Sequence, residues 1–540
     1  THLEAVIRTT PTGPETYYNL AMVLTQLRDF KAAAESFEHC ARFAPDNPDI
    51  LNNLANALRL SGQLEKTEKV FDKALARNPR HPALRCNRGW LKLARGENAS
   101  ATSDFREALD ANRGSEDAWL GLAQSLLAAG DTEQAGSVSR QALEKFPRSA
   151  ALYNLLGVYH IRDKRPEDAL RCFQESVKLL PENVDALTNL GITSEQLGEL
   201  DLAKKCLLQA LEVTPTHHPA WFHLANLANW QPAIRQVAAL EKALEAVADD
   251  TARINLEFAL AKALSKLNQH ERAFPHFIAA RRSMAARQHY DLEAAIAELE
   301  AAGLQPLKLE SAPPKRLFVV GMPRSGTTLI DQIFAAHSDA HSRGDTGLPA
   351  RLKNTLTQKP TPLGQWLRQQ MPIPEGVQCV VETSPGHFSQ VGQLASLLPE
   401  ARFIHCLRHP LDTCVSIFEQ PLTGAHAYAN TLEGLGRYYQ AYRTLMRRWQ
   451  NLLGERLITV QYEQLVTHPE DEITRLLAHC ELPLQQACLD FHQYQRAVST
   501  PSASQVRQPI NTRSVGRWRH YEPFLEPLYH VLSEDLLDHS

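Results

Sequence analysis

The first half of the chain repeats itself every 34 residues. In each period a large residue precedes a small residue by four places, and a proline lies near the end. The small residues are Ala21, Ala55, Gly89, Ala123, Gly157, Gly191 and Ala225, the large ones are Tyr17, Leu51, Trp119, Tyr153, Leu187 and Trp221, and the prolines are Pro45, Pro79, Pro147, Pro181 and Pro215. Stacked helix–turn–helix units produce such a period, because one unit leaves its apolar face open and needs neighbours to cover it. The sequence therefore predicts an all-α solenoid.

This pattern resembles the tetratricopeptide repeat, and the resemblance covers about residues 14–217. Alanines complete it on the second helix, where two helices approach closely, at Ala33, Ala101, Ala135, Ala169 and Ala203. We expect about seven repeats and a degenerate capping pair of helices, which begins near Asn255, within a superhelix over residues 1–285. The resemblance implies a groove that holds a protein or peptide partner, and a spacer or a self-association surface is the alternative.

Residues 286–315 are expected to form a helix and a linker, because Pro306, Pro313 and Pro314 interrupt any periodic pattern. Four short apolar runs follow, alternating with helical segments, and they begin at Arg316, Gln378, Arg402 and Arg456. Continuous apolar strands of this length are typical of a parallel sheet covered on both faces. Residues 316–540 are therefore predicted to form a doubly wound, P-loop-like α/β domain whose ligand lies beyond the carboxyl ends of the strands.

Composition limits the classes of ligand and partner that the chain is expected to bind. The net charge of −4 gives no general basic field, so nucleic acid is not expected to bind, and an anionic ligand must be held by local cations. No apolar run is long enough for a membrane span. Nine cysteines without metal-ligand spacing predict reduced thiols and a cytoplasmic location. The chain begins at Thr1, so removal of an N-terminal segment stays open.

The run RLFVVGMPRSGTTL, which begins at Arg316, leads from an expected strand through a glycine-rich loop into a helix. Gly321 and Gly326 have the GxxxxG spacing of a loop whose backbone N–H groups hold phosphate oxygens. Thr327 stands where a P-loop kinase needs lysine, and the nearest cation is Arg324. The loop therefore predicts a phosphate-like ligand without a metal-bound triphosphate, and the kinase interpretation becomes the weaker alternative.

The segment GMPRSGTTL resembles the 5′-phosphosulfate loop of sulfotransferases that use 3′-phosphoadenosine 5′-phosphosulfate. After a later strand, RHPLDTCVS resembles the 3′-phosphate motif of the same enzymes. The resemblance implies two groups of donor-binding residues. They are Arg324, Ser325, Gly326, Thr327 and Thr328 for the 5′-phosphosulfate, and Arg408 and Ser416 for the 3′-phosphate.

Two further segments resemble tyrosylprotein sulfotransferases. TVQYEQLV implies that Tyr462 lies near the nucleotide, and PSASQVRQPINTRSVGRWRHYE resembles the segment that closes over the donor. In that segment Ser502 is expected to hydrogen-bond the transferring sulfuryl group, and Arg517 to contact the 3′-phosphate. Arg507 and Arg513 are additional cations nearby.

The catalytic base is expected to be Asp345, because HSRGDTGLP resembles the Gly-Glu pair that supplies this carboxylate in tyrosylprotein sulfotransferases. An aspartate is one methylene shorter, and a misplacement of about 1 Å costs on the order of 10²-fold in rate. Thr383 occupies the position of a lysine that neutralises the leaving phosphate in those enzymes. Glu382 and His387 are reserve candidates for the acid/base role.

As a whole the chain resembles a bacterial family in which tetratricopeptide repeats precede a sulfotransferase domain. The resemblance implies transfer of a sulfuryl group from 3′-phosphoadenosine 5′-phosphosulfate to an acceptor hydroxyl, with adenosine 3′,5′-bisphosphate as product and no metal. Arg324, Ser502 and Asp345 are the expected catalytic residues. Three alternatives stay open: the acceptor is protein tyrosine, it is a carbohydrate or small alcohol, or the chain is an inactive nucleotide-binding scaffold.

Overall fold

The computed structural model describes residues 14–303, 315–348, 351–352, 363–494 and 506–533. The chain divides by packing into two compact units, Thr1–Leu190 and Gly191–Ser540. No helix among the described ranges is long and apolar enough to cross a membrane. All nine cysteines carry free thiols.

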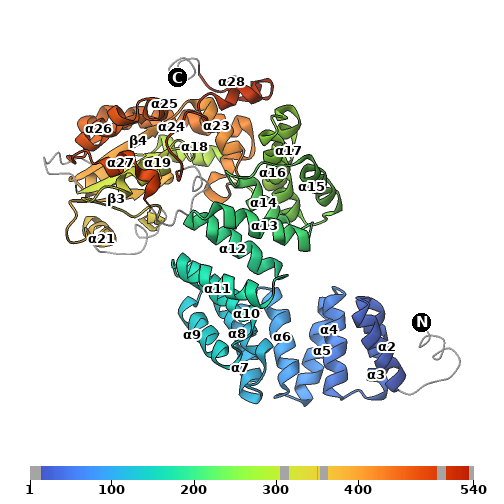
Figure 1. Ribbon diagram of the computed structural model, residues 1–540. Coiled ribbons are helices and arrows are strands. Elements are labelled where there is room, and N and C mark those ends of the chain that lie inside the picture. The colour runs from blue at the N-terminus through green and yellow to red at the C-terminus, as the bar shows by residue number, and fades with distance from the viewer. Residues whose placement is uncertain (1–13, 304–314, 349–350, 353–362, 495–505, 534–540) are drawn as a thin grey trace. The chain divides into compact units, whose positions relative to one another are not determined.

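The first unit consists of paired helices in antiparallel hairpins (Figure 1). They are α2 (Pro14–Gln26), α3 (Phe30–Phe43), α4 (Pro48–Leu60), α5 (Leu64–Arg77), α6 (Pro82–Ala94), α7 (Asn98–Ala111), α8 (Glu116–Ala129), α9 (Thr132–Lys145), α10 (Ala150–Arg162) and α11 (Pro166–Leu179), followed by α12 (Val184–Leu197), in which the boundary between the units falls. The predicted helical repeats are confirmed.

Close packing within each hairpin explains the small residue of the period. A Cβ added to Gly89 would lie 2.9 Å from the ring of Phe105, and one added to Gly157 would lie 2.4 Å from the ring of Phe173. Both rings come from the second helix of the same hairpin and are fully buried. A larger residue at the small position would therefore force the two helices apart.

The second unit opens with more helices. These are α13 (Leu200–Val213), α14 (His218–Asn226), α15 (Ile234–Ala246), α16 (Asp250–Lys266), α17 (His270–Arg287) and α18 (Leu292–Glu300). The expected degenerate pair is therefore present as α16 and α17. The predicted linker falls in residues 304–314, outside the described ranges.

A parallel five-stranded sheet follows, in the order β2-β3-β1-β4-β5. The strands are β1 (Arg316–Gly321), β2 (Ala340–Ser342), β3 (Cys379–Thr383), β4 (Ala401–Leu407) and β5 (Leu457–Gln461). Four of them coincide with the predicted apolar runs, and the three-residue β2 was not predicted. The predicted α/β domain is confirmed.

Helices cover both faces of this sheet (Figure 1). On one face, Leu317 and Val319 of β1 pack against α19 (Thr327–Ala335) and α26 (Pro469–His479). On the other, Phe318 and Val320 pack against α22 (Val391–Leu397), α23 (Pro410–Phe418), α24 (Leu432–Leu453) and residues of α16 and α17. The remaining helical elements are α21 (Leu363–Gln370), η1 (Pro385–Gln390), η2 (Gly424–Asn430), η3 (Gly454–Arg456), α25 (Tyr462–Thr467), α27 (Gln486–Leu489), η4 (Phe491–Gln493), η5 (Arg517–Phe524) and α28 (Glu526–Tyr529).

The hairpin α16–α17 shares its core with the α/β domain. Phe258 and Phe274 of this hairpin are fully buried in the cluster that also contains Phe418 and Tyr521. The rings of Phe274 and Phe418 stack at 5.6 Å. Packing thus joins the last helices before the sheet to the sheet domain, and the domain boundary at residue 285 stays a sequence-based prediction.

Candidate active site

The loop after β1 has the backbone of a phosphate cradle. Gly321 has φ +155°, and a Cβ there would lie 2.6 Å from the carbonyl oxygen of Cys406. Gly326, at φ +111°, is the N-cap of α19, and a Cβ there would meet the ring of Tyr462 at 2.9 Å. Arg324 is held at φ +68°, which is unusual for a residue other than glycine. The loop is therefore tightly wound at the positive end of a helix, where anions bind.

Most of the predicted donor-binding residues line one cavity of about 210 Å³ among the described residues. From the prediction these are Arg324, Gly326, Thr327, Thr328, Arg408, Ser416, Tyr462 and Arg517, and the additional cation Arg513 lines the cavity as well. Ser325 is buried beneath the loop, and its hydroxyl has no hydrogen-bond partner among the described residues. Ser502 lies outside the described residues. Asp345 does not line this cavity.

Arg408 lies where β4 passes into α23 and is 6% exposed. One of its terminal nitrogens donates to the carbonyl of Arg324 at 3.1 Å, and the other donates to the carbonyl of Ser514. Its guanidinium lies over the ring of Tyr462, 4.9 Å from the centroid. Its Nε is buried without a hydrogen-bond partner among the described residues. Arg408 is thus fixed against three segments with one buried donor unused.

The side chain of Arg324 connects the two predicted motifs. Its Nε donates to the hydroxyl of Ser416 at 3.1 Å. Burial is the main cause that lowers the pKa of Arg324 to about 10; the charges of Arg408 and Arg517 act in the same direction, while Glu419 opposes them. Three guanidinium groups therefore repel one another around the cavity, and a bound anion would relieve that repulsion.

Arg517 reaches the cavity because Asp412, buried in the first turn of α23, holds the backbone around it. The Asp412 carboxylate accepts from the N–H of Gly516 at 2.6 Å and from the N–H of Trp518 at 3.0 Å. The guanidinium of Arg517 then donates to both oxygens of Glu419, at 2.9 and 3.1 Å. This ion pair is the main cause that raises the pKa of Arg517.

A second group of polar residues lies at the end of β3. The Glu382 carboxylate is fully buried and accepts from the hydroxyl of Thr346 at 2.5 Å. Burial raises the pKa of Glu382, and the charge of Asp345 raises it further, while Thr346 and Arg343 lower it. Asp345 itself is exposed, and its carboxylate accepts from the N–H of Gly347 at 3.0 Å, as in a turn. The predicted base and its reserve therefore interact electrostatically.

Three other candidates have fixed positions. His387 is fully buried, its ring packs edge-on against Phe318, and burial lowers its pKa to about 3. The hydroxyl of Thr383 donates to Asp331 at 2.7 Å. Arg507 donates to the carbonyl of Gln196 and does not line the cavity. None of these three supplies a charge to the cavity as described.

Several residues of the site were not predicted from the sequence. Glu419, which pairs with Arg517, follows Ser416 by three residues, so helical spacing from the predicted motif was a usable signal. The apolar side of the cavity is formed by Leu329, Val466, Phe491, Val506 and Ile510, which come from four different segments. Scattered apolar residues carry no motif, so no local signal marks them.

The cavity residues fit a phosphate-bearing nucleotide. The unused hydroxyl of Ser325 and the unused Nε of Arg408 are buried donors, and glycines at both ends of the loop let its backbone pack closely against Cys406 and Tyr462. The first N–H groups of a helix have no intrahelical partner, so α19 adds further donors. An aromatic and apolar wall beside these donors suits a base.

Comparison with known proteins agrees with this geometry. Residues 314–486 match the sulfotransferase family, and residues 24–85, 92–158, 150–183 and 184–217 match tetratricopeptide repeats. An uncharacterized protein of Aquifex aeolicus is 25% identical over 545 residues, which cover 90% of this chain and 70% of that protein.

Two relatives carry a functional name. A putative protein-tyrosine sulfotransferase of Caenorhabditis briggsae is 28% identical over 228 residues, which cover 37% of this chain and 80% of that protein. Protein-tyrosine sulfotransferase A of Caenorhabditis elegans is 23% identical over 229 residues, which cover 37% of this chain and 60% of that protein. The chain therefore joins tetratricopeptide repeats to a sulfotransferase-family domain that is similar to protein-tyrosine sulfotransferases.

Proposed function

We propose that this protein transfers a sulfuryl group from 3′-phosphoadenosine 5′-phosphosulfate to an acceptor hydroxyl. The supporting observation is the convergence of Arg324, Arg408 and Arg517 on one cavity that opens onto the phosphate-type loop. Adenosine 3′,5′-bisphosphate carries phosphates at both ends of its ribose, so a site for it needs cations from more than one segment. The three arginines come from the loop after β1, the end of β4 and the C-terminal segment.

The residues divide between the two ends of the donor. The loop residues Arg324 to Thr328 and the N-terminus of α19 hold the 5′ end, and Arg408, Ser416 and Arg517 hold the 3′-phosphate. Tyr462 lies beside the nucleotide, and Ser502 steadies the transferring group. The donor supplies the sulfuryl group: a bond forms between sulfur and the acceptor oxygen, and the bond from sulfur to the 5′-phosphate oxygen breaks.

The acceptor hydroxyl loses its proton in this step, and Asp345 receives it. Asp345 lies on the loop after β2, whose strand neighbours β3, so the base approaches from the side of the sheet that carries Glu382. The charge of Glu382 would keep an adjacent carboxylic acid protonated after transfer. Glu382 is the second candidate for the same role, because burial raises its pKa towards neutrality.

The acceptor is a tyrosine in a protein, and the repeat groove recruits the partner that carries it. Similarity to protein-tyrosine sulfotransferases over the α/β domain supports the first part. Repeats of this kind supply a long curved surface that suits an extended peptide, which supports the second.

Calorimetry with adenosine 3′,5′-bisphosphate and with ATP tests the donor assignment. We expect preference for the bisphosphate, and loss of that preference in Arg408→Ala. Labelled-sulfate transfer into a cell extract then identifies the acceptor by what becomes labelled. Equal binding of both nucleotides would contradict the assignment.

One observation favours a second function. Thr383 replaces a lysine of the related enzymes, and its hydroxyl is already bonded to Asp331. A chain that binds the bisphosphate tightly and never transfers labelled sulfate would be a nucleotide-binding scaffold.

A further inference from the structure

Three cations from distant parts of the chain bind polar side chains at the C-terminal end of α23. Arg324 donates to Ser416, Arg517 pairs with Glu419, and Lys262 of α16 donates to the side-chain oxygen of Gln420 at 3.2 Å. Ser416, Glu419 and Gln420 are three and four residues apart, a spacing that brings side chains to one side of a helix end. Lys262 therefore lies beside the two arginines that line the cavity.

Lys262 lies outside the stretch that matches the sulfotransferase family and outside the matched repeats. Its ammonium also donates to the side-chain oxygen of Asn226 on α14 and lies 5.9 Å from the ring centroid of Phe222. Lys262 does not line the cavity itself. Lys262 must therefore act on a ligand in the cavity without contact, through the electrostatic attraction of its charge and by fixing the side chain of Gln420.

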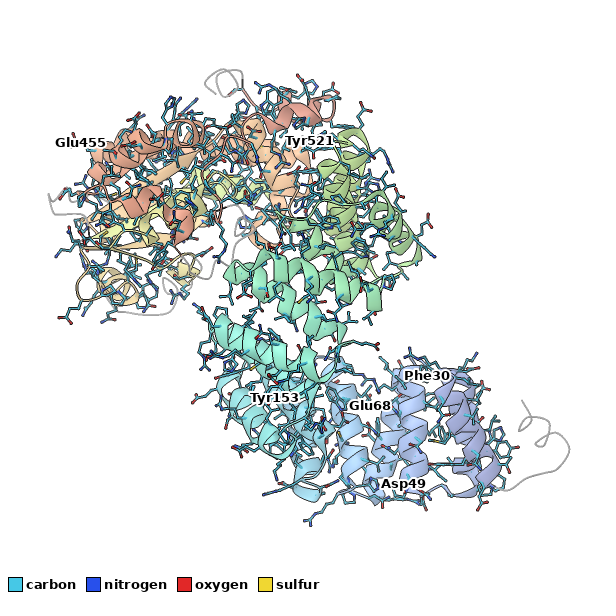
Figure 2. All side chains as sticks on the ribbon, in the orientation of Figure 1. Phe30, Asp49, Glu68, Tyr153, Glu455 and Tyr521 are labelled. Carbon is cyan, nitrogen blue, oxygen red and sulfur yellow. The ribbon has the colours of Figure 1, made fainter. Side chains whose placement is uncertain are left out.

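The charge around this helix end is unbalanced. Lys262, Arg324 and Arg517 are positive, and the carboxylate of Glu419 faces all three. Glu419 already accepts from Arg517 and from the hydroxyl of Tyr521 at 3.0 Å, and the hydroxyl of Tyr521 lies 2.8 Å from the hydroxyl of Ser265 on α16. Tyr521 is labelled in Figure 2. One carboxylate cannot neutralise three partly buried cations, so an anion at Ser416 is favoured.

We propose that Lys262 is a specificity-determining positioning residue for the 3′-phosphate of the donor, supplied by the helical hairpin that precedes the sulfotransferase domain. This inference rests on the proposed function. The side chain of Gln420, which Lys262 fixes, lies on the turn that follows Ser416. A dianionic phosphate at Ser416 therefore meets the charge of Lys262 in a medium of low dielectric constant, where one charge has a large effect.

Lys266, one turn further along α16, is a matched control. Its ammonium donates to the carbonyl of Leu227 at 2.5 Å and to that of Trp230 at 2.9 Å, and it lies over the ring of Trp230. It is held by the end of α14 and has no hydrogen bond to α23 among those described. Replacement of either lysine by methionine keeps the aliphatic stem and removes one positive charge from the same helix.

The experiment uses the full chain with Lys262→Met and Lys266→Met. Each protein is titrated calorimetrically with adenosine 3′,5′-bisphosphate and with adenosine 5′-monophosphate, and the ratio of the two affinities measures 3′-phosphate recognition. We expect Lys262→Met to reduce this ratio by roughly 10- to 100-fold, the range for loss of a charged partner. Lys266→Met should have the same ratio of affinities as the wild type.

Two results would overturn the inference, and they are distinguishable. An unchanged ratio in a folded Lys262→Met protein would remove Lys262 from recognition and leave the proposed function intact. A wild type that binds both nucleotides equally would overturn the proposed function itself. If Lys262→Met does not fold, Lys262→Gln tests the same ratio.

Proton uptake gives a readout that a purely structural lysine would not change. Burial lowers the pKa of Lys262 to about 7, with smaller contributions in the same direction from the charges of Arg324, Lys266 and Arg517 and an opposing one from Glu419. Glu195 of α12 and His223 of α14 also feel its charge. An added phosphate raises the pKa of Lys262, so binding at pH 8 should take up about one proton. Calorimetry in two buffers of different ionisation enthalpy should show this uptake in the wild type and its loss in Lys262→Met.

Discussion

Buried titratable side chains at the end of β3 differ in what they can do. Glu382 keeps one oxygen bonded to Thr346, and burial raises its pKa above the usual range of a glutamate, which makes it a stronger base than an exposed carboxylate. His387 lies against Phe318 with neither ring nitrogen hydrogen-bonded to a described residue, and its pKa is lowered to about 3. A histidine that stays neutral over the physiological range is a packing residue, so the reserve role proposed for His387 is not supported.

Replacement of the two carboxylates separates their roles. We expect Asp345→Asn to lower the rate of sulfuryl transfer by about 10²- to 10⁴-fold, the usual contribution of a general base. Bisphosphate affinity should be unchanged, because Asp345 does not line the nucleotide cavity. The control is Glu382→Gln: if the acid limb of the pH–rate profile disappears in this variant and persists in Asp345→Asn, the base is Glu382.

Acid sensitivity follows from His387. Its pKa is about 3 in the folded state and 6.5 in the unfolded chain, so the unfolded chain binds more protons below pH 6.5 and stability falls as the pH falls. At about 1.4 kcal/mol per pH unit, we expect a loss of about 2 kcal/mol between pH 6.5 and 5 from this residue. In His387→Leu, the fall in the free energy of unfolding between pH 6.5 and pH 5, measured by urea unfolding, should be smaller than in the wild type by this amount. Equal losses in both proteins would mean that His387 is protonated when folded.

At the scale of elements, α23 organises the site from both of its ends. Its start carries Asp412, which holds the backbone beside Arg517, and its end carries Ser416 and Glu419. Arg281 of α17 is 1% exposed and donates to the carbonyls of Ile417, Phe418 and Gln420. A cation at this position hydrogen-bonds the last carbonyls of the helix, and its positive charge interacts favourably with the negative end of the helix dipole.

Asp412 does not line the cavity, but loss of its carboxylate should release the backbone beside Arg517 and so misplace the Arg517 guanidinium. Asp412→Ala leaves two buried N–H groups unpaired, so we expect about 1–3 kcal/mol lower stability. Bisphosphate affinity should fall by about tenfold, while 5′-monophosphate affinity changes little. Thermal unfolding and calorimetry measure the two effects. Asp412→Asn keeps one acceptor, so its stability and bisphosphate affinity should lie between those of Asp412→Ala and the wild type. Normal bisphosphate affinity in Asp412→Ala would show that Asp412 does not position Arg517.

The elements differ in how far the sequence could predict them. The strand β1 and its loop were predicted because eleven consecutive residues, Arg316 to Gly326, carry the apolar run and the glycine spacing. β2 was missed because three residues, of which only Ala340 is buried, carry no periodic pattern. Arg408 and Ser416 were predicted because one nine-residue motif, RHPLDTCVS, contains both, whereas Lys262 and Gln420 are 158 residues apart and only tertiary packing joins them.

At the scale of the whole molecule, the hairpin α16–α17 belongs by packing to the unit that contains the sheet. Full burial of Phe258, Phe274 and Phe277 contributes about 1.5–3 kcal/mol each. Their sum is comparable with the entire stability of an ordinary domain. The α/β domain therefore depends on helices that the sequence assigns to the repeat array.

Two fragments test this dependence. We expect residues 191–540 to fold and to bind adenosine 3′,5′-bisphosphate like the full chain, because they form one compact unit. Residues 316–540, which begin at β1 and lack the hairpin, should show no cooperative thermal transition by circular dichroism. A cooperative transition and normal nucleotide affinity in the shorter fragment would show that the hairpin is dispensable.

Ser265 and Tyr521, whose hydroxyls lie 2.8 Å apart, are separated by 256 positions along the polypeptide. A ribosome releases the N-terminal partner long before the C-terminal one, and domains acquire their structure in order of synthesis. The repeats of the first unit are therefore complete while the phenylalanines of α16 and α17 still lack the segment around Tyr521, which is made about 250 residues later. During translation this hairpin exposes apolar surface until that segment emerges, and Arg517 reaches the nucleotide site only then.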